Sequence, residues 1–171
     1  MYIIFYNWKN SYITKERIVK MNLTEKERTL LEDLKSQEQL CIEKYTRYES
    51  MAHDICLKNL FAELKTKEAE HLATVTKILH GDQVSVGACP MATESVTKCA
   101  ASSVSEEEKC EDSYLCKDAL SMEKHVSSVY DISVFEFKNP ALRDALAHIQ
   151  KEEQNHGERI YSYMAINGMY S

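Results

Sequence analysis

The chain repeats itself: moving its second half back by 85 residues aligns the two halves without a gap. Overall identity is low, but residues of the same type recur in the same order. The matched pairs are Asp33 and Asp118, Ser36 and Ser121, Glu38 and Glu123, Tyr45 and Tyr130, Leu57 and Leu142, Ala62 and Ala147, Glu68 and Glu153, and His71 and His156. This repeat predicts a fold made of two similar units.

Few residues interrupt the chain, because only 4 of its 171 residues are Gly and 2 are Pro. So few turn formers favour long helices over a many-stranded sandwich or barrel. A first helix is expected from Thr24, which forms a capping-box pattern with Glu27, to about residue 53. A second helix is expected from Asp54, a typical N-cap, to Gly81, a typical stop.

The second half follows the same plan. A third helix is expected over about residues 113–138. Asn139 and Pro140 then form an N-cap followed by the favoured first helical residue. The last helix is expected to run to about Ala165, before Gly168.

Four long helices, two tight turns and one long connection predict an all-α protein. We expect a ferritin-like four-helix bundle, built from two antiparallel helical hairpins that a long crossover linker joins. The expected hairpins are residues 22–80 and 113–171, with the linker at 81–112. Residues 22–171 would then form a single domain.

Residues 1–21 are expected to be an extension that is poorly ordered or not native, because they lack clear periodicity and Met21 directly precedes the first helix. The apolar cluster at residues 1–6 has no positive segment before it and no clear cleavage site after it. Secretion by a signal peptide is therefore not expected.

Each half contains one Glu followed, after 29 residues, by Glu-x-x-His. Residues three apart on a helix share a face, so each Glu-x-x-His can offer both side chains to one centre. The six candidate metal ligands are Glu38, Glu68, His71, Glu123, Glu153 and His156.

The spacing also predicts that these ligands lie at one height. In each hairpin, the single Glu and the Glu of Glu-x-x-His are equidistant from the turn, at residue 53 or 138. In an antiparallel hairpin, equal distance from the turn means equal height, here about 22 Å at about 1.5 Å per residue. The two hairpins are thus expected to bring four Glu and two His together in the core.

This ligand set is that of carboxylate sites for paired metal ions. Carboxylates are hard, anionic and able to bridge, and imidazole suits iron. We expect two metal ions, with iron favoured and manganese or zinc as alternatives. Tyr45 and Tyr130 lie two turns after Glu38 and Glu123, where each can hydrogen-bond a ligand carboxylate or simply pack in the core.

The alternative is a helical core that kept these residues as a buried salt-bridge network after losing its metal. Four buried carboxylates and two His would leave several charges unpaired, which is costly without cations. That cost favours metal binding. Other acids and histidines are expected at the surface, pointing away from the site or satisfied in the core: Glu43, Glu70, Glu152, His53, His80, His125 and His148.

Composition limits the partners. A net charge of −6 disfavours nucleic acid and anionic membranes, and no apolar run is long enough to span a bilayer. The six Cys, at positions 41, 56, 89, 99, 110 and 116, form no Cys-x-x-Cys pair, which argues against a rubredoxin-type iron site or a zinc ribbon. They are expected either as reduced thiols or as cross-links into a larger assembly.

Several stretches resemble a known family. They are Ser-Met-Glu-Lys at 121–124, Tyr130, Phe135-Glu136, Asn139-Pro140, Lys-Glu-Glu-Gln-Asn-His at 151–156 and the closing Tyr-Met-Ala-Ile-Asn-Gly-Met-Tyr at 163–170. Together they are similar to the Coat F domain of spore coat proteins from endospore-forming bacteria. Lys-Ser-Gln-Glu-Gln-Leu-Cys at 35–41, with Tyr45, looks like the partner hairpin of two-hairpin members. The resemblance implies a ferritin-like fold and a place in or near the spore coat.

Two functions follow as expectations. The first is a spore coat protein with a metal-binding body, which other coat proteins contact through Cys89, Cys99 and Cys110. The second is a cytoplasmic di-iron oxidoreductase, similar to rubrerythrin, that reduces peroxide or oxygen or oxidises Fe(II), with no catalytic residue apart from the ligands. The expected location is the spore coat or the mother-cell cytoplasm, and the chain is a candidate homodimer.

Overall fold

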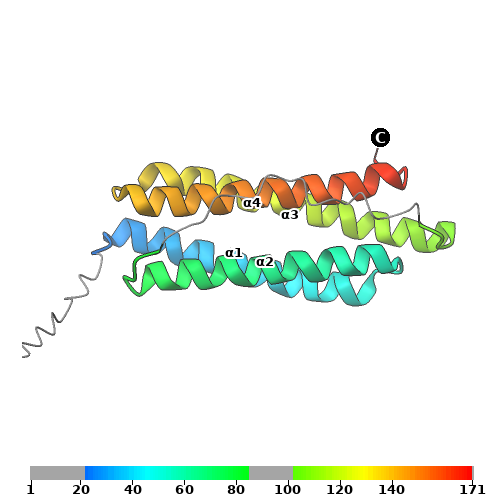
Figure 1. Ribbon diagram of the computed structural model, residues 1–171, viewed down its shortest axis with the longest axis horizontal. Coiled ribbons are helices and arrows are strands. Elements are labelled where there is room, and N and C mark those ends of the chain that lie inside the picture. Colours follow the sequence, from blue (N-terminus) through cyan, green and yellow to red (C-terminus); the bar gives the residue numbers. More distant parts are fainter. Residues whose placement is uncertain (1–21, 85–101, 171) are drawn as a thin grey trace, which may run out of the picture.

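The protein was analysed as a computed structural model that describes residues 22–84 and 102–170. Within these ranges it is all-helical and contains no strand. The four helices are α1 (Glu25–Met51), α2 (Ile55–Leu79), α3 (Glu106–Glu136) and α4 (Pro140–Ile166). Helices α1 and α2 pack as one hairpin and α3 and α4 as the other, and the two hairpins lie side by side as two layers (Figure 1). The predicted pair of helical hairpins is confirmed.

Capping side chains start the helices where the sequence predicts. The Thr24 hydroxyl accepts from the Glu27 amide, and the Glu27 carboxylate accepts from the Thr24 amide, which forms a complete capping box. Asp54 caps α2, and Asn139 caps α4 ahead of Pro140. These caps satisfy amides that have no partner within their own helix.

Helix α3 begins seven residues earlier than the sequence analysis predicts, at Glu106 and not at residue 113. Ser105 and Glu108 form a second capping box, with the Ser105 hydroxyl accepting from the Glu108 amide at 3.2 Å. The acidic run at 106–108 lies in the predicted linker but forms the first turn of the helix. There the positive end of the helix dipole stabilises negatively charged side chains. The connection between the hairpins is correspondingly shorter than predicted.

Glycine ends both return helices. Gly81 and Gly168 have φ of 81° and 63°, a conformation that residues with a side chain rarely adopt. The amides of Asp82 and Met169 then bond back to the carbonyls of Lys77 and Met164, at 3.0 and 2.8 Å. This pattern is a Schellman motif, and it confirms the predicted ends of α2 and α4.

Each hairpin turn is held by a carboxylate from the other hairpin. Asp112, fully buried on α3, accepts from the amides of His53 at 2.8 Å and Asp54 at 3.0 Å, in the turn between α1 and α2. Glu27 on α1 accepts from the amide of Lys138 at 3.0 Å, in the turn between α3 and α4. Positions 27 and 112 are themselves related by the 85-residue repeat. These three hydrogen bonds, made by two carboxylates, therefore fix the height of one hairpin relative to the other.

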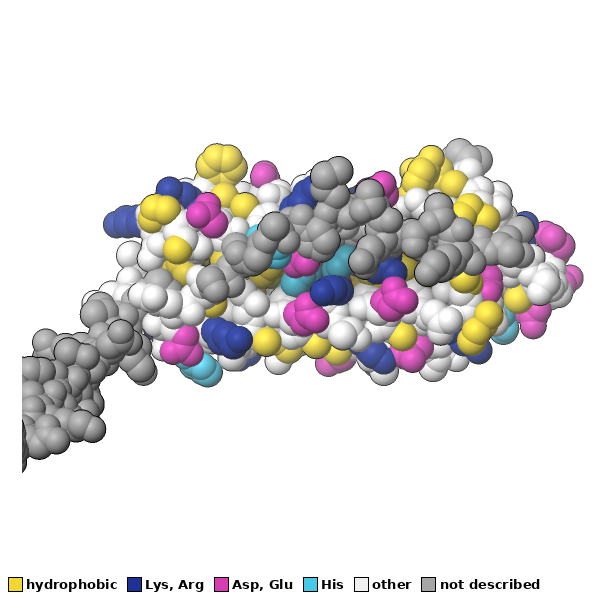
Figure 2. Space-filling model, viewed as in Figure 1, with side chains coloured by type: hydrophobic (Ala, Val, Ile, Leu, Met, Phe, Trp, Pro, Cys, Tyr) yellow, Lys and Arg dark blue, Asp and Glu magenta, His cyan; other side chains and the backbone are white. Residues whose placement is uncertain are grey.

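The interior is a continuous apolar core that surrounds one polar layer. Tyr45, Tyr130, Tyr163 and Phe61 are the largest side chains that are fully buried. Charged side chains of both signs are interspersed along the described part of the face shown in Figure 2, as expected for the solvent side of amphipathic helices. None of the described helices has the length and apolar character needed to cross a membrane.

Some predictions concern residues outside the described ranges. They are those for the extension at 1–21 and for the linker cysteines Cys89 and Cys99. In the described part of the chain, Cys41 and Cys116 are buried free thiols, and Cys110 is an exposed free thiol near the start of α3.

Candidate metal centre

The structure brings all six candidate ligands together at mid-height between the four helices. None of these side chains belongs to a residue that is more than 3% exposed. Helix α1 supplies Glu38, α2 supplies Glu68 and His71, α3 supplies Glu123, and α4 supplies Glu153 and His156. The equal spacing from the two turns accounts for this convergence, since each hairpin places its acids and its imidazole at the same level.

The six side chains form two overlapping groups, each able to hold a metal ion. Within each group, one ligand atom per residue lies within 4.8 Å of all the others. The first group is Glu38, Glu68, His71 and Glu153, and the second is Glu68, Glu123, Glu153 and His156. Glu68 and Glu153 belong to both groups, so their carboxylates could contribute to either one.

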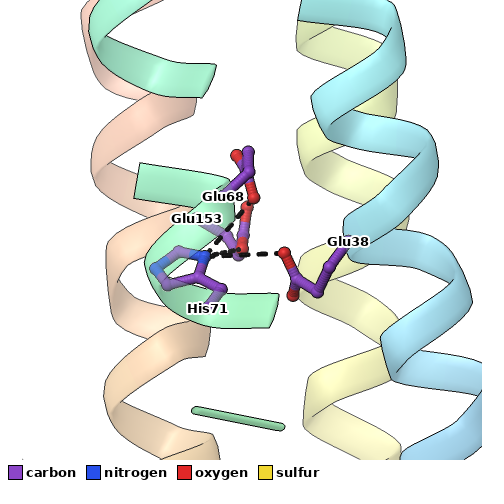
Figure 3. A group of neighbouring side chains, drawn as sticks. All are labelled: Glu38, Glu68, His71 and Glu153. Carbon is purple, nitrogen blue, oxygen red and sulfur yellow. Dashed lines mark ion pairs between the residues drawn. The ribbon is translucent and has the colours of Figure 1, made fainter. Parts of the chain in front are cut away.

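In the first group, the carboxylates surround Nδ1 of His71 (Figure 3). This nitrogen lies 3.0 Å from Glu153 Oε1, 3.3 Å from Glu68 Oε2 and 3.7 Å from Glu38 Oε2. Three acids from three helices thus point toward one imidazole nitrogen.

The second group repeats this arrangement around Nδ1 of His156. That nitrogen lies 3.0 Å from Glu68 Oε1, 3.6 Å from Glu153 Oε2 and 3.7 Å from Glu123 Oε2. The two imidazole rings stack with their centroids 5.5 Å apart and their planes at 16°. Both rings therefore turn the same nitrogen toward the shared carboxylates.

The polar atoms at the centre are buried without hydrogen bonds. Eight oxygen and nitrogen atoms of the six ligands have no hydrogen-bond partner in the described part of the chain. They are Glu38 Oε2, Glu123 Oε2, both carboxylate oxygens of Glu68 and of Glu153, and Nδ1 of His71 and of His156. Buried polar atoms are normally satisfied, so a convergent set of unpaired donor atoms fits the coordination of cations.

Burial and mutual repulsion set the protonation of the acids when no cation is bound. Burial, together with the neighbouring carboxylates, raises the pKa of Glu38 and of Glu123 well above its ordinary value. Burial also opposes the ionisation of Glu68 and Glu153, but the two imidazole groups outweigh it and lower the pKa of both acids. The pKa shifts thus favour ionisation of the two shared acids over that of Glu38 and Glu123.

The imidazole groups respond in the opposite sense. Burial alone lowers the pKa of His71 and of His156, but the surrounding carboxylates reverse this and raise the pKa of both. Carboxylates and imidazole groups therefore favour each other's charged forms, whereas the acids disfavour ionisation of one another. Cations at the centre would offset the repulsion among the acids.

The two tyrosines hydrogen-bond ligand carboxylates across the hairpins. Tyr45 on α1 donates to Glu123 Oε1 on α3, and Tyr130 on α3 donates to Glu38 Oε1 on α1. Burial raises the pKa of both tyrosines well above its ordinary value, so the hydroxyl groups keep their protons. Each bond leaves the second carboxylate oxygen directed at the centre.

Glu152 is a contributor that the sequence analysis missed. We expected it to point elsewhere, and it does lie outside the two groups, but its Oε2 is 3.0 Å from Nε2 of His71. The same oxygen lies 3.4 Å from Nε2 of His148. An imidazole that ligates metal usually donates its other N–H to a carboxylate. This rule makes Glu152, an acid next to the ligand Glu153, a candidate from the sequence.

The remaining acids and histidines lie outside the centre. Glu43, His53, His80 and His125 are exposed, as the sequence analysis predicts. Glu70 is exposed and pairs with Lys67 at 2.8 Å. Within the described ranges, Glu152 is the one acid of this set that pairs with a candidate ligand, and the partly buried His148 pairs with Glu152.

Comparison with known proteins gives one match. No curated protein and no solved structure matches the chain. The match covers most of α3 and all of α4, and so includes Glu123, Glu153 and His156. Residues 111–171 match the family model of the Coat F domain, to which the second hairpin of this chain is similar.

Proposed function

We propose that this protein is a spore coat protein of the Coat F type whose ferritin-like body holds two metal ions. The Coat F match over residues 111–171 supports the first half of the proposal. Two helical hairpins that a crossover joins, with one Glu-x-x-His on the second helix of each, support the ferritin-like assignment.

The observation that carries the metal proposal is the set of eight buried donor atoms without hydrogen-bond partners. The two Nδ1 atoms face all four carboxylates at 3.0–3.7 Å. Two imidazole groups cannot compensate four buried carboxylates, and an unsatisfied buried polar or charged group costs about 1–3 kcal/mol or more. Their convergence from four helices costs stability unless cations occupy the centre. Metal binding explains why both Nδ1 atoms and the shared carboxylates face one another.

Each ion would have one Glu and one His that bind it alone, and two further Glu residues would bind both ions. Glu38 and His71 would hold one ion, Glu123 and His156 the other, and Glu68 with Glu153 would bridge them. Oxygen-rich sites with one imidazole per ion favour iron or manganese, whereas a structural zinc site commonly uses thiolates. Iron is the proposed native metal.

Metal analysis after anaerobic reconstitution tests this proposal. The wild-type chain should retain about two Fe(II) ions after desalting, since a paired site needs two. Glu68→Ala with Glu153→Ala should abolish uptake and leave helical circular dichroism largely unchanged. Fewer than about one iron or manganese ion per wild-type chain would contradict the proposal.

A matched control removes two acids from the same two helices without touching the centre. Glu70 and Glu158 are exposed on α2 and α4. Glu70→Ala with Glu158→Ala changes the net charge as much as the ligand variant does. It should retain full metal uptake, which separates loss of ligands from loss of negative charge.

The coat role has its own test, which does not involve metal. The protein should be enriched in isolated spore coats, as measured by immunoblotting of coat extracts against vegetative cell lysate. Cys110 offers an exposed free thiol for cross-linking with other coat proteins, so part of the protein should need reductant for extraction. Presence in vegetative cytosol alone would contradict the coat role. The proposed homodimer stays a prediction.

A second candidate function is reduction of peroxide or oxygen at the same centre. The donor set favours it, because it is the set of the di-iron and di-manganese carboxylate proteins. When bound, a pair of Fe(II) ions would supply the two electrons that convert one hydrogen peroxide and two protons into two waters. Anaerobic Fe(II)-loaded protein should then consume one peroxide per two Fe(II) faster than Fe(II) in buffer. Equal rates would contradict this function.

A further inference from the structure

The two imidazole groups of the candidate metal centre differ in the partner of Nε2, the ring nitrogen that faces away from the shared carboxylates. Nε2 of His71 lies 3.0 Å from the carboxylate of Glu152 on α4. The residue that corresponds to Glu152 in the first half, 85 positions earlier, is Lys67. Lys67 pairs with Glu70 at 2.8 Å, and an ammonium group has no lone pair with which to accept an imidazole N–H. Among the described residues, no carboxylate contacts Nε2 of His156.

The two halves also differ at the next residue outward from the centre. Glu152 Oε2 also lies 3.4 Å from Nε2 of His148, one helical turn earlier on α4. The residue that corresponds to His148 in the first half is Glu63, which pairs with Arg159 and not with the residue at position 67. The series of contacts from His148 through Glu152 to His71 therefore has no counterpart at His156 among the residues that the structure describes.

Glu152 determines the form in which His71 meets a cation. A carboxylate can only accept, so Nε2 of His71 must carry the hydrogen of this bond. Nδ1, which faces Glu38, Glu68 and Glu153, is then the nitrogen that offers its lone pair to a metal ion. Such a partner also fixes the ring orientation and makes the imidazole a stronger ligand. His156 faces the centre through the same nitrogen but lacks this support within the described ranges.

We propose that Glu152 is a positioning residue that makes the two metal positions inequivalent, so that the ion at His71 binds first and more tightly than the ion at His156. This inference rests on the proposed metal centre and adds the order of filling. Loss of an outer carboxylate partner of this kind typically lowers metal affinity about 10–100-fold. An effect of that size should fall on one position and spare the other.

Stepwise titration of the full-length, metal-free protein with Co(II) under anaerobic conditions tests the proposal. The wild type should show two steps in visible absorbance and in calorimetry. Glu152→Ala should weaken the tighter step about 10–100-fold and change the weaker step by less than about threefold. Glu152→Gln, which keeps an acceptor oxygen without the charge, should lie between the two. Glu70→Ala, the matched exposed acid beside His71, should leave both steps unchanged.

The reciprocal test adds a carboxylate partner for Nε2 of His156. Lys67→Glu places a carboxylate at the position that corresponds to Glu152, and should strengthen the weaker step so that the two affinities approach each other. In Zn(II)-loaded, ¹⁵N-labelled protein, the wild type should show one slowly exchanging, low-field imidazole N–H that Glu152→Ala abolishes. A residue that only stabilised the fold would not remove this single resonance.

The outcomes separate this inference from the proposed function. A wild-type protein that binds no Co(II) contradicts the metal centre and this inference with it. A wild-type protein that binds two Co(II) ions with equal affinity overturns the inference alone. So does a Glu152→Ala variant in which both steps weaken equally or neither changes.

Discussion

Tyr130 of the second hairpin donates its hydroxyl hydrogen to Glu38 of the first. Both side chains are fully buried, and the pair has a counterpart in Tyr45 and Glu123. Each tyrosine therefore donates a hydrogen bond to a carboxylate of the opposite hairpin. The hydrogen bonds join the two hairpins at the same level at which the candidate ligands meet.

Removing one of these hydroxyl groups should destabilise the metal-free protein. Tyr130→Phe leaves Glu38 Oε1 buried without its donor, and we expect the free energy of unfolding to fall by about 1–3 kcal/mol. Urea denaturation in the presence of a chelator measures the change. Tyr45→Phe should lose a similar amount, whereas Tyr161→Phe, at a residue that is 46% exposed, should lose little. Equal stability of Tyr130→Phe and wild type would show that the bond does not hold the hairpins together.

Metal binding should stabilise the folded protein, and this stabilisation should depend on the ligand carboxylates. A cation that binds only the folded state adds about 2.7 kcal/mol at a free concentration of 100 times Kd. Thermal unfolding of the wild type should therefore shift upward as Fe(II) or Mn(II) is added anaerobically. The variant Glu68→Ala with Glu153→Ala should show no such shift. A shift that persisted in this variant would place the stabilising ion elsewhere.

Glu27 should make the stability of the protein depend on pH. Burial opposes its ionisation, but hydrogen bonds from the amides of Thr24 and Lys138 outweigh burial, and its pKa lies below the ordinary value of 4.5. Stability from this carboxylate is thus present above about pH 4.5 and is lost as pH falls through the lower pKa of the folded state. Glu27→Gln should be less stable than wild type by about 1 kcal/mol at pH 6.

The gap between wild type and Glu27→Gln should then shrink below pH 4.5, because the wild-type carboxylate becomes protonated as well. Urea denaturation of both proteins at each pH, with chelator present, measures the difference. Taking the difference cancels the titration of the buried centre, which both proteins share. A gap that stayed constant down to pH 3 would mean that Glu27 does not titrate with the fold.

The early start of α3 can be tested at its cap. Ser105→Ala removes the hydroxyl that accepts from the Glu108 amide, and should cost about 1 kcal/mol of stability. Ser121→Ala, an exposed position in the middle of the same helix, should be neutral or slightly stabilising, since Ala is the better helix former. No loss in Ser105→Ala would favour a helix that begins nearer residue 113.

Local signals and the repeat together predicted most of the fold. Thr24, Asp54 and Asn139 are caps whose effect depends on the few residues that follow them, so the sequence alone places these helix starts. The level of the six ligands also follows from the sequence, because distance from a turn translates directly into height in a hairpin. The start of α3 also has a local signal, the Ser105 cap before the acidic run at 106–108, but the predicted linker extends beyond it to residue 112.

The contacts between hairpins were harder to predict. Glu152 lies outside the two ligand groups, as its position on its own helix predicts, but that position does not reveal that α2 places His71 beside it. The same holds for Tyr45 and Tyr130, which bond to acids of the opposite hairpin. These partners depend on the packing of one hairpin against the other, which periodicity within one helix does not encode.

The reciprocal bonds of Asp112 and Glu27 to the two turns have a mechanical consequence. Sliding one hairpin along the other by a single helical turn, about 5.4 Å, would break all three hydrogen bonds. It would also carry Glu38 and Glu68 away from Glu123 and Glu153. The hydrogen bonds at the two turns, about 22 Å from the ligands, thereby hold the ligands of the two hairpins at the same height.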